Sequence, residues 1–364
     1  MRTLVVNVGS SSLKLSVVDD GAATATETLA HTGGMLDRRA IEEVVERHRP
    51  IHAVGHRIVH GGPTFTKPVL IDNLVRAELD LLVDLAPLHL PLSLAAVDLV
   101  SSLLPEAPAV ASFDTAFHAT MPAAASTYAL PAEWRRRWPL RRFGFHGLSH
   151  AWAAHRAAEL VGQPVEALRT VTCHLGAGAS LAAIAGGISV DTTMGFTPLD
   201  GLVMATRPGS LDPGLVLWLE EHVGLPASEL ATALEHRSGL LGLAGSADMA
   251  AVLQAEAAGD DRATLAIGVY CHRLKASLAA MTAALGGLDV VVFTGGVGER
   301  SASIRARCTA GLAYLGIQVD RAANAAAQPD ADITASGATV RTLVVEARED
   351  LQIAAEVRSV LNGP

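Results

Sequence analysis

Hydrophobic residues fall into short, strand-like runs at several places along the chain. Thr3 to Val8 is an apolar and β-branched run, and Leu13 to Val18 resumes the pattern after a glycine and three serines. Two such runs joined by small turn residues predict a β-hairpin. The same plan recurs at Val171 to His174 and Leu181 to Ile184, around a loop at 176–178. The sequence therefore predicts two similar halves.

The rest of the pattern alternates strands with helices. Strands are expected at 51–59, 110–113, 188–191, 288–294 and 340–345, and helices at 41–48, 74–85, 263–285 and 350–361. Prolines at 87, 91, 105 and 108 interrupt the segment after the second of these helices. The Gly- and Pro-rich stretch 195–213 is too long for an idle connector, so we expect an ordered loop or an active-site segment. Strands that alternate with helices predict an α/β fold.

Composition and charge narrow the class of protein. The chain has 364 residues, of which 50% are hydrophobic and 18% are charged, and this predicts a globular protein of two domains. A net charge of −9 argues against a nucleic-acid partner. The apolar runs are too short for a membrane span, and the N-terminus lacks the features of a secretory signal. Three cysteines without metal-ligand spacing, Cys173, Cys271 and Cys308, fit a reducing compartment, so we expect a cytoplasmic protein.

The first hairpin turn offers groups that can bind an anion. It runs from Asn7 to Lys14 and includes Gly9 and the hydroxyl residues Ser10 and Ser12. Exposed amides and hydroxyls can hold phosphate oxygens, and a lysine adds positive charge. The P-loop pattern is absent. Serine and glycine are also ordinary turn residues, so this turn alone is equally well explained as a hairpin turn.

Two further glycine-rich turns strengthen the case for a nucleotide. His174 to Ser180 occupies the matching place in the second half, and Thr294 to Glu299 follows a buried strand and precedes a helical stretch near Ser301. Amides at the start of a helix can bind phosphate. Arg57, Asp114, His146 and Arg207 could serve a second substrate, since an arginine fork matches carboxylate and phosphate oxygens. Taken singly, each of these residues is also compatible with a structural role.

The ensemble of motifs resembles the acetate kinase (acetokinase) family, and the resemblance covers nearly the whole chain. The matching stretches are Asn7 to Lys14, His56 to Gly62, Ala86 to His89, Phe113 to His118, Phe143 to His150, His174 to Ser180, Met194 to Gly201, Thr206 to Pro213, Phe293 to Glu299 and Glu346 to Leu351. The resemblance implies two actin-like, ribonuclease H-like domains with mixed sheets, helices on both faces and a cleft between them. It also implies Mg²⁺-dependent, reversible phosphoryl transfer from ATP to acetate, giving ADP and acetyl phosphate.

Residue roles follow from the resemblance. It implies that Asn7 and Glu349 are associated with Mg²⁺, that Arg57 and Arg207 hold carboxylate and phosphoryl oxygens, and that His146 stabilises the transition state. Asp114 matches the family's essential carboxylate. Because acetate is already ionised at pH 7, we expect Asp114 to orient other groups and not to act as a general base. The apolar pocket for the methyl group of acetate would comprise Val59, Leu88, Phe145 and Pro198. The residues expected to contact the nucleotide are Ser10, Ser12, Lys14, His174, Leu175, Gly176, Ala177, Gly178, Asp248, Gly296, Val297, Gly298, Glu299 and Arg300.

The sequence departs from the family pattern in three places, of which the first two bear on the donor. Ala177 stands where the family usually has asparagine, Ala250 stands where an arginine is expected near the adenosine, and the segment between Asp20 and Ile51 is shorter than usual. Pyrophosphate or another nucleotide therefore stays open as the donor, and propionate stays open as the acceptor. A catalytically weak protein that senses acetyl phosphate or nucleotide is a further alternative.

The resemblance also sets expectations for domains and assembly. The first domain would take residues 1–116 and 350–364. The second would take 117–349, bind the nucleotide and form a homodimer, with the long apolar helix at 263–285 as a contributor.

Overall fold

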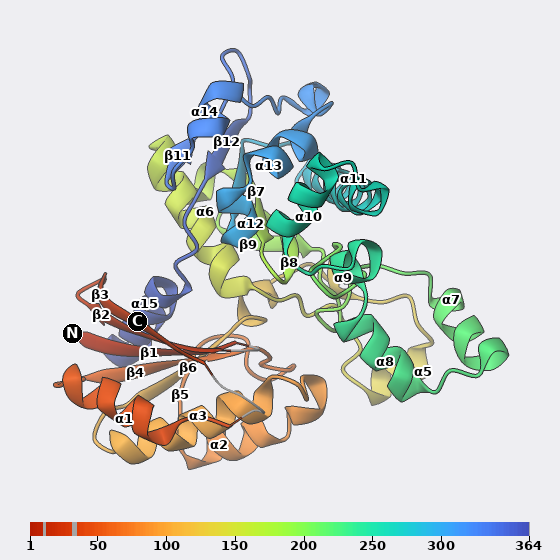
Figure 1. The fold of residues 1–364 in the computed structure, drawn as a ribbon. Helices are drawn as coiled ribbons and strands as arrows, with labels where there is room; N and C mark the ends of the chain where they lie inside the picture. The colour runs from red at the N-terminus through yellow and green to blue at the C-terminus, as the bar shows by residue number, and fades with distance from the viewer. Residues whose placement is uncertain (10–11, 31–34, 364) are drawn as a thin grey trace. The chain divides into compact units, whose positions relative to one another are not determined.

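The chain divides into two compact units. The computed structural model describes residues 1–9, 12–30 and 35–363. The first unit contains Met1–Ala119, Phe145–Trp152 and Arg348–Pro364, and the second contains Thr120–Gly144 and Ala153–Ala347 (Figure 1). The segment 145–152, expected in the second domain, belongs to the first unit because Leu148 packs against Val5, Val110 and Ile353 of its core.

A six-stranded mixed sheet forms the centre of the first unit. Its strands are β1 (Arg2–Val8), β2 (Ser12–Asp19), β3 (Ala22–Ala30), β4 (Ala53–Ile58), β5 (Val69–Leu70) and β6 (Ala109–Phe113). Their order is β3-β2-β1-β4-β6-β5, with β1, β4 and β6 parallel and the other pairings antiparallel. The predicted hairpin is confirmed, and its register places Asn7 opposite Lys14.

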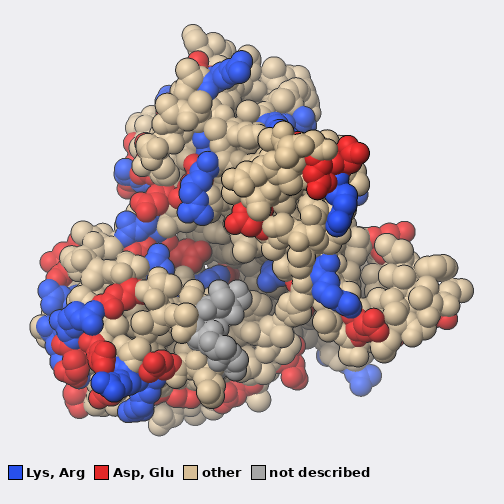
Figure 2. Space-filling view, in the orientation of Figure 1, with Lys and Arg blue, Asp and Glu red and all other residues tan. Residues whose placement is uncertain are grey.

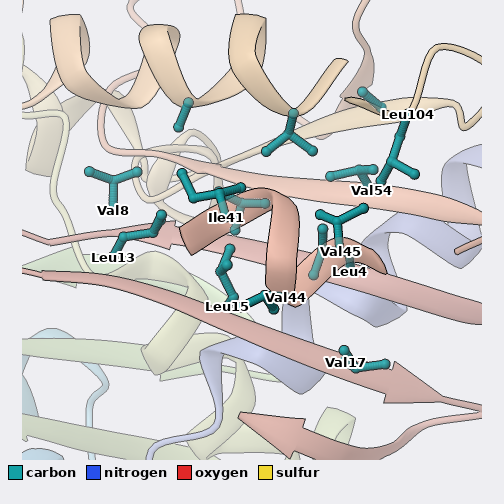
Figure 3. Packing of buried hydrophobic residues seen from close by; sticks show 14 residues of the cluster. Leu4, Val8, Leu13, Leu15, Val17, Ile41, Val44, Val45, Val54 and Leu104 are labelled. Carbon is teal, nitrogen blue, oxygen red and sulfur yellow. The ribbon is translucent and has the colours of Figure 1, made fainter. Parts of the chain in front are cut away.

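Alternation along β1 explains why helices cover both faces of this sheet. Leu4, Val6 and Val8 point to one face, where they join a core formed with α1 (Arg38–Arg47) and α3 (Leu90–Leu103), as Figure 3 shows for part of the cluster. Val5 points to the other face and packs against α15 (Glu349–Asn362). Successive side chains of a strand point to opposite faces, so a run of apolar residues is what a doubly covered strand requires.

The second unit repeats the same sheet plan. Its strands are β7 (Arg169–Leu175), β8 (Ala179–Ala185), β9 (Ile188–Thr192), β10 (Val290–Thr294), β11 (Ala331–Asp332) and β12 (Arg341–Val344). Taken from β9, the order β9-β8-β7-β10-β12-β11 has the same sequence of antiparallel and parallel pairings as the first sheet. The prediction of two similar halves is thus confirmed.

The remaining elements are helices. They are α2 (Asn73–Asp80), η1 (Val83–Leu85), η2 (Ala116–His118), α4 (Ala123–Ser126), α5 (Ala132–Arg137), α6 (Gly147–Val161), η3 (Val165–Ala167), α7 (Pro213–Trp218), η4 (Leu219–Val223), α8 (Ala227–His236), α9 (Gly239–Ala244), α10 (Met249–Ala257), α11 (Asp261–Ala284), α12 (Gly295–Arg300), α13 (Ala302–Thr309), η5 (Ala313–Leu315) and α14 (Arg321–Ala326). No described helix is long and apolar enough to cross a membrane.

Several local predictions differ from the structure. The helix expected at 74–85 ends at Asp80 and is followed by a separate turn at Val83–Leu85. The proline-rich segment after it contains α3, because Pro91 occupies the first turn of that helix, where its missing N–H costs nothing. The helix expected near Ser301 is preceded by α12, which begins directly at Gly295.

Candidate active site

Strand ends of the first unit bring four predicted site residues together. Asn7 lies near the end of β1, Arg57 near the end of β4, and Asp114 directly after β6, while Glu349 begins α15. The carboxyl ends of β1, β4 and β6 meet at one edge because these strands are parallel. That edge is where open α/β sheets usually place ligand-binding groups.

Arg57 is the centre of this cluster. Its Nε and Nη2 donate to the two carboxylate oxygens of Asp114 at 2.9 and 2.6 Å, and its Nη1 donates to Asn7 Oδ1 at 3.1 Å. Asn7 Nδ2 donates in turn to Glu349 Oε2 at 2.9 Å, and Glu349 Oε2 lies 3.9 Å from Arg57 Nε. The two acids and the amide thereby fix the orientation of the guanidinium.

Burial makes the pair electrostatically strong. The side chains of Arg57 and Asp114 are 15% and 2% exposed. The pKa of Asp114 is raised, first by burial and also by Glu349, although Arg57 and the backbone N–H of His146 lower it. Against the cost of burial, Asp114 and Glu349 raise the pKa of Arg57 above its usual value. We take the pair as ionised, because the guanidinium keeps its proton and donates two hydrogen bonds to the carboxylate.

His146 lies beside this cluster in an uncommon backbone conformation. Its φ is +57°, which is rare for a residue other than glycine. Its N–H donates to Asp114, so its backbone is tied to the same carboxylate that holds Arg57. Such conformations persist only where the surroundings enforce them, and they concentrate at functional sites.

The residues expected to bind the methyl group of acetate are split between the units. Val59 and Phe145 are buried in the first unit, and the Phe145 ring meets the His60 ring edge-on at 5.4 Å. Leu88 also belongs to the first unit but is 55% exposed. Pro198 belongs to the second unit, where its carbonyl accepts from Arg207 Nη1 at 3.4 Å.

Arg207 is held without a carboxylate contact among the residues that the structure describes. Its Nη1 has a carbonyl and the Met204 sulfur as partners. Burial lowers the pKa of Arg207, and Glu235 raises it. A partly buried guanidinium whose donors are not saturated by acids is suited to bind an anionic ligand.

In the first hairpin turn, Lys14 is exposed and faces the same side of the sheet as Asn7, its cross-strand partner. Ser12 begins β2, and its backbone carbonyl accepts from Gly9 N–H at 2.8 Å. Ser10 lies outside the described residues.

A pocket of about 370 Å³ lies within the second unit. It is lined by Gly176, Ala177, Ala205, Leu240, Ala247, Asp248, Met249, Ala250, Leu253, Tyr270, Gly296, Val297, Arg300 and Ser301. Two of the glycine-rich turns therefore open into one cavity, with apolar residues of α9, α10 and α11 also in its wall. Gly295, the first residue of α12 directly after β10, has a φ of +77°, and a Cβ there would lie 2.8 Å from the Leu175 carbonyl oxygen.

Other residues expected at the nucleotide have defined structural partners. Asp248 lines the pocket and also caps α10, accepting from the N–H groups of Ala250 and Ala251. One carboxylate oxygen of Glu299 accepts from the N–H groups of Gly295 and Ala347, so it braces the start of α12. His174, Leu175, Gly178 and Gly298 lie on or beside the strands and turns that carry the pocket wall.

The apolar wall of this pocket is not predicted from the sequence. Leu240, Met249, Leu253 and Tyr270 come from three separate helices. Each looks like an ordinary core residue in the sequence, and only the packing of the helices shows a cavity beside them. Ala177 and Ala250, the two departures from the family pattern at the nucleotide, both line it.

The duplicated sheet and its sequence of pairings define the actin-like α/β fold. The chain belongs to the acetokinase family, whose profile matches residues 27–355. It is 49% identical to an acetate kinase from Synechococcus sp. over 86% of this chain and 77% of the relative. The crystal structure of an acetate kinase from Porphyromonas gingivalis is similar, with a TM-score of 0.91, 35% identity and 99% coverage of both chains. A propionate kinase from Francisella tularensis is also similar, with a TM-score of 0.90, 34% identity and 99% coverage of both chains.

Proposed function

We propose that the chain is an acetate kinase that transfers the γ-phosphoryl group of ATP to acetate, reversibly, giving acetyl phosphate and ADP. The observation that carries this proposal is the Arg57–Asp114 pair with Asn7 and Glu349 at the strand ends, in a chain of the acetokinase family. Phosphoryl transfer asks the protein for positioning and for positive charge near the equatorial oxygens. A guanidinium fixed by a buried carboxylate supplies both.

The roles of the side chains follow from their settings. Arg57 binds carboxylate or phosphoryl oxygens with a geometry that Asp114 has already set, so little reorganisation is needed during transfer. Arg207 offers a second guanidinium with unsaturated donors. His146 stabilises charge on the group in transit, and Val59 and Phe145 contact the methyl group. Acetate is the nucleophile in its ionised form, so no side chain has to remove a proton from it.

The pocket of the second unit suits a nucleoside triphosphate. Backbone amides of the glycine-rich turns meet phosphates, and the apolar wall of Leu240, Met249 and Leu253 takes the base. Pyrophosphate would need no such wall, so the cavity favours a nucleotide donor. Relative to the family pattern, the chain lacks a side-chain amide at Ala177 and a guanidinium at Ala250. Two contacts expected to the nucleotide are therefore missing, but the cavity is still present.

Magnesium fits the oxygen donors of the first unit. The described residues contain no group of three or more His, Cys, Asp or Glu side chains that could enclose a metal. Mg²⁺ does not require one, since it is commonly held by one or two carboxylates together with water and substrate phosphates. Glu349, with the Asn7 amide beside it, would hold the ion, which supplies charge neutralisation on the phosphates when bound. We also place the protein in the cytoplasm, in keeping with its free, buried cysteines.

A homodimer formed through the second unit is supported by an exposed apolar surface. Leu215, Leu217, Trp218 and Val223 of α7 and η4 are each 45–53% exposed. The projecting end that carries these elements is largely free of charged side chains on the face seen in Figure 2, whereas acidic and basic groups intermingle over the first unit. Large apolar patches on a protein surface mark interaction sites. This surface is a stronger candidate for the interface than α11, much of which is buried within the unit.

The test is trapping of the acyl phosphate with hydroxylamine. Purified protein, Mg²⁺ and acetate are combined with ATP, GTP or pyrophosphate, and the series is repeated with propionate and butyrate. We expect product with ATP and acetate. Product with pyrophosphate alone would refute ATP as the donor, and faster turnover of propionate than of acetate would refute acetate as the preferred acceptor. No product from folded protein would favour the sensor alternative.

A further inference from the structure

The peptide bond between Phe145 and His146 is held from both sides by one short segment. His118 Nε2 lies 3.0 Å from the Phe145 carbonyl oxygen, and since a carbonyl only accepts, Nε2 carries the proton and donates. The N–H of the same peptide belongs to His146 and donates to the Asp114 carboxylate. His118 ends η2, which begins two residues after Asp114. One stretch of chain therefore holds this peptide at its C=O and at its N–H.

The segment needs such support because its backbone is strained. A left-handed conformation at a residue with a side chain costs roughly 1–2 kcal/mol, and His146 adopts one at φ +57°. Gly147 N–H donates to the Asp114 carbonyl at 2.9 Å, and a Cβ at Gly147 would lie 2.2 Å from that oxygen. The two segments interlock so closely that only glycine fits there.

The setting of His118 suits a fixed hydrogen-bond donor. Its side chain is fully buried, and burial lowers its pKa to about 4, so the ring is neutral at physiological pH. Its ring also meets the His150 ring edge-on, with 5.7 Å between centroids. A neutral ring with its proton on Nε2 is suited to orient the carbonyl, and its burial shields that proton from solvent.

We propose that His118 is a positioning residue for phosphoryl transfer, acting through the Phe145–His146 peptide to set the direction of the His146 ring and the bond from His146 N–H to Asp114. This inference rests on the proposed function. The described lining of the pocket in the second unit does not include His118, so we expect it to act on the transfer step and not on nucleotide binding. Rotation of this peptide would move His146 and release Asp114 together.

The test compares variants that keep or remove the donor. His118→Met preserves bulk and removes the N–H, and we expect kcat to fall on the order of 100-fold, the effect of a misplacement of about 1 Å. The KM for ATP should stay within about threefold of the wild-type value. That limit corresponds to a change in binding free energy of about 0.7 kcal/mol. His118→Gln, whose amide nitrogen takes the place of Nε2, should recover most of kcat. The matched control is His56→Met, at a buried histidine of β4 whose Nε2 has no hydrogen-bond partner among the described residues, and its kcat should match the wild type.

Each outcome bears on a separate claim. Absence of wild-type turnover would refute the proposed function, whereas an active wild type with an unchanged kcat in His118→Met would refute this inference alone. Equal losses in His118→Met and His56→Met would show a general effect of burial and would also refute it. Should His118→Met fail to fold, His118→Asn replaces it: asparagine is too short to reach the carbonyl, so it should be slow where His118→Gln is fast, and equal rates overturn the proposal.

Discussion

The ion pair between Arg57 and Asp114 allows a matched test, because the second unit contains the same geometry in an exposed setting. Arg169 donates to Asp289 through Nε and Nη2 at 3.0 and 2.9 Å, close to the distances in the Arg57–Asp114 pair. The Arg169 and Asp289 side chains are 43% and 34% exposed, against 15% and 2% for Arg57 and Asp114. Asp114→Asn and Asp289→Asn therefore make one chemical change at two levels of burial.

The size of each effect follows from that difference. In Asp114→Asn, the new side chain would keep one oxygen for Arg57 and turn an NH₂ group toward the other guanidinium donor. Among the described residues, Glu349 at 3.9 Å would then be the acid left to neutralise the buried cation. Breaking a buried pair costs about 3–5 kcal/mol, and we expect the low end because Arg57 keeps its Asn7 contact. The exposed pair is worth about 0.2–1 kcal/mol. Without the Asp114 carboxylate, the Arg57 guanidinium is no longer held in its orientation. Loss of one oriented donor at the reacting group lowers kcat by roughly 100- to 1,000-fold.

The assay combines acyl-phosphate trapping, nucleotide titration and denaturant unfolding for both variants. Asp114→Asn should lose kcat while its affinity for ATP changes by less than about threefold, a free-energy change under about 0.7 kcal/mol. Asp289→Asn should be active and only slightly destabilised. A kcat for Asp114→Asn within about twofold of the wild type would refute the role assigned to Asp114, since one lost donor should cost far more. An equal loss of stability in the two variants would refute the argument from burial.

Three further predictions concern the nucleotide pocket, acid stability and magnesium. Arg305 is buried and donates to the carbonyls of Gly298 and Glu299 at the end of α12. Arg305→Met should therefore raise the KM for ATP about tenfold or more, with little change in the KM for acetate. A KM for ATP equal to that of the wild type would contradict this prediction. Burial lowers the pKa of His56 to about 3. The unfolded chain then takes up a proton at this histidine near pH 6.5 that the native state does not, so the free energy of unfolding falls as pH drops from about 6.5 toward 3. His56→Phe should reduce the slope of unfolding free energy against pH by up to about 1.4 kcal/mol per pH unit. Parallel stability curves for the variant and the wild type would refute this prediction. Glu349→Gln keeps an oxygen for Asn7 but loses the charge, and should raise the Mg²⁺ concentration for half-maximal activity about tenfold, or roughly 1.4 kcal/mol. An unchanged Mg²⁺ requirement would rule out Glu349 as a ligand.

The parts of the fold that the sequence predicts are those with a strong local pattern. Both hairpins and the parallel strands carry apolar runs, and all are present. The edge strand β3 escapes prediction because Thr24, Thr26 and Thr28 give it a polar, exposed face, which an edge strand tolerates. The helix α3 escapes it because Pro91 indicates a break unless the start of the helix is known. The charged cluster is predictable from motifs, but its hydrogen bonds are not, since Asn7 and Glu349 lie at opposite ends of the chain.

The two copies of the sheet carry different residues at the ends of equivalent strands. In the first unit, β1 and β4 bring Asn7 and Arg57 together at one edge. In the second, β7 and β10 place His174 beside Thr294, and glycine-rich turns come directly after both strands. Strand interiors are constrained by burial on both faces, whereas residues at the strand ends are free to change without loss of the core. In the proposed function, one duplicated framework thus presents fixed charges to the transferred group in one unit and glycine-rich turns to a nucleotide in the other.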